Sequence, residues 1–374
     1  MKSCKSMLWG TEANRILASP EQDVLKCLGR VAMDGATQDR LSMLFAGSIN
    51  WERFAEIARF HRMTPIVYRH LSQFFPEAVP HLILKKMRNE YHGNFLNALF
   101  LTEELLRLLT RLSAEGIRVL PYKGPVLAQT LYGDITLRMA GDLDLVVQAS
   151  NVVRAEEVLV SCGYSSLCGI DNTMMSKNYH CQFLHNDLGT QVELHWGLAP
   201  ASIPFAIGLN SVWDRLEFQQ FYGRDVLIFS PEDLLIILCV HGTKHRWRQL
   251  RWACDIAELM RRYPALDWNC VFDYSYNLGC SRYVALGVAI ASDLFDVSPP
   301  ETDYRKLWTN IPRLVEIIYE DLFDIHNSPP NFIRDAPYQF LLHEKFKDRL
   351  MSVPLNAIGH LRGKLSRVMR HLGT

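Results

Sequence analysis

The sequence predicts an α+β protein in which a central segment of strands and helices lies between two helical regions. Three observations predict this class. Apolar residues recur at three- and four-residue steps toward both ends of the chain, and strand-like runs fall between residues 117 and 196. The length of 374 residues exceeds one ordinary core. We therefore expect a helical N-terminal subdomain over 1–96, a core over 97–229 and a helical C-terminal subdomain over 230–374.

Helical spacing marks the N-terminal region. Trp51, Phe54 and Ile57 follow one another at three-residue steps, which indicates one buried helix face. A further helix is predicted over 97–114, because its leucines form one stripe and Gly116 suits the position just after a helix end. Both patterns are typical of helices that pack against a core.

The central segment begins with a strand, a tight turn and a helix. An extended run over 117–122 is followed by the turn 123–125, whose proline suits the first turn of a helix that we expect to reach Tyr132. A second strand is predicted over 142–147, and an amphipathic helix over 151–162 follows it. This alternation is typical of strands that are covered by helices.

A hairpin and a return to helix complete the pattern. Two strand-like runs, 180–185 and 190–196, are separated by a polar turn that contains a glycine. Further along, Ser230 offers a helix N-cap, and Pro231 suits the first helical position that follows. The rest of the chain is expected to be predominantly helical.

Composition narrows the class of function. Forty basic residues offset forty acidic ones, so no long-range field attracts nucleic acid, and a long nucleic-acid partner is not expected. The nine cysteines include no CxxC pair and are interpreted as reduced thiols of a cytoplasmic protein. The start lacks a secretory apolar stretch, and the apolar run 234–240 is far shorter than the ~20 residues of a membrane span.

Paired carboxylates are the main chemical signal. Side chains alternate along a strand, so Asp142 and Asp144 project to one face. On the hairpin strand Glu193 and His195 share a face in the same way. Converging carboxylates repel one another unless a cation lies between them, and Mg²⁺ or Mn²⁺ with oxygen ligands meets that need. A solvated edge strand is the alternative interpretation of the Asp-x-Asp pair alone.

Groups suited to phosphate accompany these acids. Gly124 lets the backbone approach a phosphate at the start of a predicted helix, and Lys123 adds a positive charge. Arg138 offers a second one. Two metal ions held by such acids can bind a triphosphate and stabilise a departing pyrophosphate.

The run KGPVLAQTLYGDITLRMAGDLDLVV, together with VELHW and HGTKHRWRQLRWACDIAEL, resembles a known family. It is similar to the largely uncharacterised bacterial nucleotidyltransferase family often called NTP_transf_5, within the DNA polymerase beta-like superfamily, over roughly residues 50 to 290. The resemblance implies a core built on a mixed sheet with flanking helices. It also implies Asp142 and Asp144 as metal ligands and Glu193 as the third catalytic carboxylate.

The sequence departs from the superfamily's usual pattern in the first turn. Most members have Gly-Ser there, and the serine helps to hold the nucleotide phosphates. This chain has Lys123-Gly124-Pro125 instead. Phosphate binding is therefore expected to rely on Lys123 and Arg138.

A basic segment with interleaved tryptophans lies between residues 241 and 252. It is either a solvated helix face or a wall of the nucleotide site, and in the second case Lys244, His245 and Arg251 contact the nucleotide. His241 and His245 have the spacing of a zinc-binding pair, but Gly242 occupies the place of the glutamate that such a motif needs. A structural or substrate-facing role is favoured over zinc.

Two further residues near these groups are weaker candidates. His195 is expected either to orient a metal-bound group or to be a hydrogen-bonded histidine at the sheet rim. Asp255 is expected to pair with a nearby arginine. Neither residue is needed for the main hypothesis.

The functional hypothesis is a metal-dependent transfer of a nucleoside monophosphate from an NTP to an acceptor hydroxyl or phosphate, with release of pyrophosphate. One alternative is a catalytically degenerate fold that acts as a nucleotide sensor or a partner-binding scaffold. Another is a different phosphoryl transfer, such as that of a kinase. The acceptor is not specified by the sequence, and a sugar, another small molecule or a peptide is compatible with it.

Overall fold

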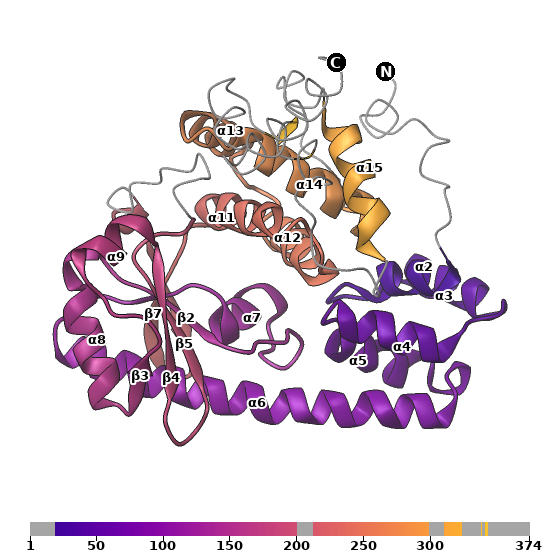
Figure 1. The fold of residues 1–374 in the computed structure, drawn as a ribbon. Coiled ribbons are helices and arrows are strands. Elements are labelled where there is room, and N and C mark those ends of the chain that lie inside the picture. Colours follow the sequence, from indigo (N-terminus) through magenta and orange to yellow (C-terminus); the bar gives the residue numbers. More distant parts are fainter. Residues whose placement is uncertain (1–18, 200–211, 299–309, 324–337, 339–340, 343–374) are drawn as a thin grey trace, which may run out of the picture.

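The computed structural model describes residues 19–199, 212–298, 310–323, 338 and 341–342. Its fold is α+β, as predicted, with a mixed five-stranded sheet and many helices (Figure 1). Helix α6 runs along the lower edge of the view and connects the N-terminal helices to the sheet. No helix within these ranges combines the length and the apolar character needed to cross a membrane.

The N-terminal region is helical, as its periodicity predicts. Asp34 and Asn50 cap two of its helices by accepting hydrogen bonds from the backbone N–H groups of Thr37 and Arg53, which satisfies donors that a helix start leaves free. The helices that precede α6 are α2 (Pro20–Leu28), α3 (Gly35–Phe45), α4 (Trp51–Phe60), α5 (Thr64–Phe74) and the short η2 (Pro76–Ala78).

Helix α6 (His81–Ala114) is longer than predicted. The prediction that it begins at residue 97 is wrong, because Ile83 and Met87 continue the buried stripe toward the N-terminus. The domain boundary expected near residue 96 therefore falls inside one continuous helix, and the division of the chain into three parts stays a prediction.

The five-stranded sheet has the order β1-β2-β5-β4-β3. Strands β2 and β5 pair in parallel, whereas the other neighbours pair antiparallel, and the predicted hairpin is confirmed as β4 and β5. Pro121 cannot donate to a ladder, and the first strand is shorter than predicted. The strands are β1 (Leu120–Pro121), β2 (Leu143–Val146), β3 (Tyr164–Ser166), β4 (His180–His185) and β5 (Gln191–His195).

Helices and a small second sheet complete the central part. The predicted helix from the Lys-Gly-Pro turn to Tyr132 is confirmed, and Gly133 ends it in the left-handed conformation with φ of 69°. The elements are α7 (Gly124–Tyr132), η3 (Ala149–Asn151), α8 (Val152–Ser161), α9 (Asn172–Lys177) and the antiparallel pair β6 (Glu217–Phe221) and β7 (Arg224–Ile228).

The C-terminal region begins as predicted. The Ser230 hydroxyl accepts a hydrogen bond from the backbone N–H of Asp233, and Pro231 occupies the first turn. Its described helices are α11 (Pro231–Lys244), α12 (Leu250–Arg262), α13 (Trp268–Asn277), α14 (Ser281–Phe295) and α15 (Ile311–Leu322).

The buried side chains form two hydrophobic cores. One lies around the sheet and takes its residues from between Ala98 and Val226. The other joins the N-terminal helices to α11, α12 and α14, and it also contacts the sheet through Tyr122 and Val146. The two helical regions therefore share one core although they are far apart in the sequence.

The cysteines differ from the prediction at one pair. Cys168 and Cys181 form a disulfide, so the interpretation of every cysteine as a reduced thiol is wrong there. The antiparallel pairing of β3 with β4 brings the two residues together across a separation of 13 residues, which no CxxC-type spacing indicates. The other described cysteines are free, and all but Cys270 are buried.

Candidate active site

The acidic residues meet because of the strand register. In the parallel pairing of β2 with β5, Asp144 lies beside Glu193 and Val146 lies beside His195. Alternation places the leucines on either side of Asp144 in the sheet core. Asp142 is one residue outside β2 and is half-buried rather than part of the strand.

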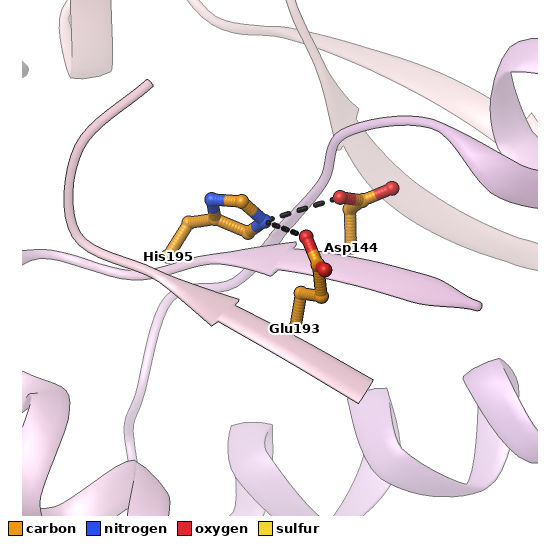
Figure 2. A group of neighbouring side chains, drawn as sticks. All are labelled: Asp144, Glu193 and His195. Atoms are coloured by element: carbon orange, nitrogen blue, oxygen red, sulfur yellow. Dashed lines mark hydrogen bonds and ion pairs between the residues drawn. The ribbon is translucent and has the colours of Figure 1, made fainter. Parts of the chain in front are cut away.

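His195 connects the two carboxylates. Its Nε2 lies 3.1 Å from Asp144 Oδ1 and 3.3 Å from Glu193 Oε2 (Figure 2). One potential ligand atom from each of these three residues lies within 4.8 Å of the others. Two carboxylates and an imidazole are a donor set that divalent metals accept, so these residues fit a metal ion. Asp142 is not part of this group in the described residues.

The acids differ in their electrostatic surroundings. Burial disfavours the charge of Asp144, but the Lys123 ammonium at 3.0 Å and the His195 ring hold its pKa well below the ordinary value. A hydrogen bond from His195 lowers the pKa of Glu193 despite partial burial. Burial and the charge of Asp144 raise the pKa of Asp142. Asp144 and Glu193 are therefore held ionised, as metal ligands must be.

The turn before α7 lies directly against these acids. Gly124 has φ of +58°, and a β-carbon there would lie 3.6 Å from the carbonyl oxygen of Asp142. A side chain at this position is therefore strained. Lys123, expected at the phosphates, instead donates a hydrogen bond to Asp144 Oδ1 in this structure.

Arg138 has a different position from the one its expected role requires. Its guanidinium donates two hydrogen bonds to Asp255, at 2.8 and 2.9 Å, and both side chains are buried. Tyr132 donates a third to the same carboxylate, at 2.7 Å. The pairing of Asp255 with an arginine is confirmed. Arg138 is held as part of this cluster and has little freedom to reach a phosphate.

The basic segment is not one helix face. Helix α11 ends at Lys244 and α12 begins at Leu250, and between them Arg246 and Trp247 adopt positive φ angles of 55° and 53°. Trp247 packs on Gly242, where a β-carbon would lie 2.5 Å from the indole ring. The glycine that interrupts the zinc-like motif therefore makes room for this tryptophan.

Two cations of this segment face the acids without a carboxylate partner. Lys244 donates to the Tyr179 hydroxyl at 2.5 Å, and Arg251 donates to the carbonyl oxygen of Met139 at 2.7 Å. Neither makes an ion pair with a described residue. Burial, with the nearby guanidinium groups of Arg138 and Arg62, lowers the pKa of Arg251 to about 9. Burial lowers the pKa of Lys244.

Aromatic rings lie beside these cations. The rings of His241 and His245 are 4.7 Å apart, and both lie within 5.5 Å of the Trp252 ring. Burial and neighbouring cations lower the pKa of His245 to about 4 and that of His241 well below its ordinary value, so both are neutral at pH 7. His241 and His245 belong to no group of three possible metal ligands among the described residues.

The acids, His195 and the two cations Lys244 and Arg251 line one cavity of about 400 Å³. We call its acidic side, Asp142, Asp144, Glu193 and His195, the sheet wall. Its other side is formed by α11, α12 and the turn between them, and we call it the helical wall. It consists of His241, Lys244, His245, Arg251 and Trp252.

Each residue predicted for the site lines this cavity, including Lys123, Gly124 and Arg138. Sequence reasoning missed Tyr179 and Gln182, which line it from and beside β4. Gln182 lies on the Glu193 face of the hairpin and donates to that carboxylate at 2.9 Å. Strand alternation could have found Gln182, whereas nothing in the sequence indicates the contact of Tyr179 with Lys244.

Comparison with known proteins gives a family and a weak structural likeness. The model of the family described as uncharacterised nucleotidyltransferase, NTP_transf_5, matches residues 47–296. The solution structure of the antibiotic-resistance factor ANT(2'')-Ia is 14% identical, covers 58% of this chain and 98% of its own, and has a TM-score of 0.30. An antigenic nucleotidyltransferase-like protein from Paracoccidioides brasiliensis is 17% identical, with 56% and 91% covered and a TM-score of 0.35. No curated protein matches the sequence.

Proposed function

We propose, from the premise that the chain belongs to the family of uncharacterised nucleotidyltransferases, that it transfers a nucleoside monophosphate from an NTP to an acceptor hydroxyl or phosphate. The observation that carries the proposal is the register of β2 with β5, in which Asp144 lies beside Glu193 and both line one cavity. Two cations that make no ion pair with a described carboxylate, Lys244 and Arg251, face these acids from the helical wall. Such a cavity suits a ligand that brings metal to one wall and phosphate to the other.

The sheet wall would hold the metal. Asp144 and Glu193 supply carboxylate oxygens, His195 supplies an imidazole nitrogen, and Asp142 lines the cavity next to them. Mg²⁺ or Mn²⁺ bound there would neutralise the phosphates and make the α-phosphorus easier to attack. Lys123 and His195 both contact Asp144 through Oδ1 in this structure, so metal binding through that oxygen would require both contacts to loosen.

The helical wall would hold the phosphates. Lys244 and Arg251 line the cavity and form no ion pair with a carboxylate in the part of the chain that the structure describes, so a bound anion would supply the missing charge. The bare backbone at Gly124, at the start of α7, lets a phosphate come close on the other side. The rings of His245 and Trp252 offer apolar faces for the remainder of the nucleotide.

The reaction follows from this placement. An acceptor oxygen forms a bond to the α-phosphorus, and the bond from that phosphorus to the oxygen bridging to the β-phosphate breaks. Pyrophosphate leaves with the electron pair, and the acceptor proton passes to solvent. The fixed walls contribute by aligning the acceptor and the leaving group and by compensating charge.

Transfer of label from an α-³²P NTP to an acceptor fraction, with Mg²⁺ or Mn²⁺, tests the proposal. We expect labelled product from the purified chain and none above background from Asp144→Asn. Asp187→Asn, which changes an exposed acid in the hairpin turn, is the matched control and should keep full activity. A product labelled only by γ-³²P would identify a kinase instead. Failure of the chain to bind any NTP in the presence of Mn²⁺ would rule out the proposal.

One observation favours the second candidate, a nucleotide-sensing or partner-binding scaffold without turnover. Lys123 replaces the usual Gly-Ser turn, and its ammonium contacts Asp144, the acid that a metal would need. Titration calorimetry combined with the labelling assay separates the two functions. For a scaffold we expect the wild-type chain to bind NTP without forming labelled product. For a transferase we expect labelled product from the wild-type chain, and in Asp144→Asn both this product and the metal dependence of NTP binding should be lost.

A further inference from the structure

Helix α6 carries an apolar patch on its solvent side. Phe95, Leu96, Leu99 and Phe100 are 38%, 66%, 42% and 38% exposed, and their spacing places them on one side of the helix. Buried residues of the same helix face the opposite way, into the sheet core. Figure 1 shows α6 at the edge of the molecule with the other elements to one side of it. We call these four residues the α6 patch; a grouped apolar surface of this kind is typical of an interaction site.

The α6 patch is the same in both directions along the helix. Counting outward from its midpoint, a leucine comes first on each side, Leu96 and Leu99, and a phenylalanine follows, Phe95 and Phe100. In a two-fold symmetric contact, residue i of one copy meets residue j of the other, and j meets i. An antiparallel pair of α6 helices centred on this midpoint would place the leucines at one level and the phenylalanines at the next. The patch is therefore complementary to itself.

The polar side chains beside the patch obey the same symmetry. His92 and Glu103 are exposed and lie at equal distances from the midpoint, so each would meet the other across the two-fold axis. Arg88 donates to His92 Nε2 at 3.3 Å, which adds a positive charge next to the expected position of the second Glu103. Glu103 makes no ion pair with the described residues of its own chain. Gly93 keeps the backbone bare beside the patch, which lets a second helix come close.

We propose that two copies of the chain associate through their α6 patches as an antiparallel helix pair. No residue of the patch lines the cavity, so each copy keeps its own open site. The inference is independent of the nucleotidyl-transfer activity and holds equally for a scaffold.

Sedimentation velocity of the full chain over a dilution series tests the association. We expect a dimer that dissociates on dilution, and Leu96→Glu/Leu99→Glu should be monomeric throughout. Val160→Glu is the matched control, since it places the same charge at a 53% exposed apolar position on α8 and should leave the dimer intact. Circular dichroism melting curves verify that each variant is folded.

Changes of charge at positions 92 and 103 test the antiparallel register of the two α6 helices. His92→Glu places two acids opposite each other and should raise the dimer dissociation constant at least about tenfold. Adding Glu103→Lys to it restores an opposite pair and should return the constant toward the wild-type value. A wild-type chain that stays monomeric at every concentration overturns the proposal, as does a dimer that survives Leu96→Glu/Leu99→Glu. A failure of the exchange to rescue His92→Glu overturns the antiparallel register.

Discussion

The two walls of the cavity differ in how their charge is compensated. On the sheet wall, Asp144 is contacted by Lys123 and His195 from within the chain. On the helical wall, the hydrogen bonds from Lys244 and Arg251 go to uncharged oxygen atoms. A half-buried cation that makes no ion pair with a described carboxylate is costly, and the helical wall therefore gains more than the sheet wall from an anionic ligand.

This difference predicts separate roles for the two walls, one in turnover and the other in nucleotide binding. The sheet wall is preorganised because strand pairing fixes its acids, whose pKa values are lowered at Asp144 and Glu193. The helical wall is held by a link to the central segment, in which Asp255 of α12 binds Arg138 and Tyr132. Changes on the sheet wall should therefore affect turnover, whereas changes on the helical wall should affect nucleotide affinity.

The largest expected effect comes from removing the link between α12 and the central segment. Asp255→Ala leaves the Arg138 guanidinium buried without its counter-charge and removes an acceptor of the Tyr132 hydroxyl. Breaking such a buried pair costs about 3–5 kcal/mol of the free energy of unfolding. Urea denaturation measures the loss.

The surface pair Arg313–Glu316 provides the control for that experiment. Both side chains are about half exposed or more, at 65% and 47%, and Glu316→Ala should cost less than about 1 kcal/mol. Equal losses of unfolding free energy for Asp255→Ala and Glu316→Ala would show that the buried Asp255–Arg138 pair stabilises the fold no more than a surface pair does.

On the sheet wall, Glu193→Gln should mainly reduce turnover. The amide keeps the shape of the side chain but removes one of the charges that would hold the metal. We expect kcat to fall by about 10²–10³-fold, or about 3–4 kcal/mol, with a higher metal concentration at half-saturation. Gln182→Ala, which removes only the hydrogen bond to Glu193, is the control and should have a smaller effect. An unchanged kcat would place the chemistry elsewhere.

The sheet wall could be predicted from the sequence because it depends on local rules. On each of the two strands, alternation places the acid, Asp144 or Glu193, on the face opposite to the one that packs in the core. The Lys-Gly-Pro turn marks the start of α7. The parallel register that sets these acids side by side is not local. The position of His195 between the two carboxylates depends on the same register, so the sequence alone does not decide between its two expected roles.

For the helical wall, the sequence predicts which types of residue are present but not how they are arranged. The sequence indicated a basic segment with tryptophans, but the break between α11 and α12 depends on Trp247 packing against Gly242. The sequence predicts Arg138 at the phosphates and does not reveal its pairing with Asp255, since this partner lies 117 residues along the chain. Long-range pairing of this kind leaves no periodicity in the sequence.

On the helical wall, Arg251→Gln and Lys244→Gln should weaken nucleotide binding. Each removes a charge-assisted contact to phosphate, and we expect KM for the NTP to rise about 10–100-fold while kcat changes little. Arg248→Gln is the matched control, because Arg248 belongs to the same basic segment but does not line the cavity. A fall in kcat at constant KM would contradict the division of labour between the walls.

The smallest expected effect is a pH dependence of the free energy of unfolding that arises from His61, a residue in contact with α12. His61 Nδ1 accepts a hydrogen bond from the backbone N–H of Leu250, the first residue of α12, and burial lowers the pKa of His61 from 6.5 to about 3. Folding therefore favours neutral His61. Above the ordinary pKa the group contributes nothing to pH dependence; as the pH falls below it, only the unfolded chain takes up the proton, and stability is lost until the pH reaches the folded value.

His61→Gln tests this dependence, because an amide keeps an acceptor for Leu250 without titrating. Between about pH 6.5 and 4.5 the free energy of unfolding of the wild type should fall more steeply than that of the variant, by about 1.4 kcal/mol per pH unit. Parallel curves for wild type and His61→Gln would mean that protonation of His61 does not loosen the helical wall.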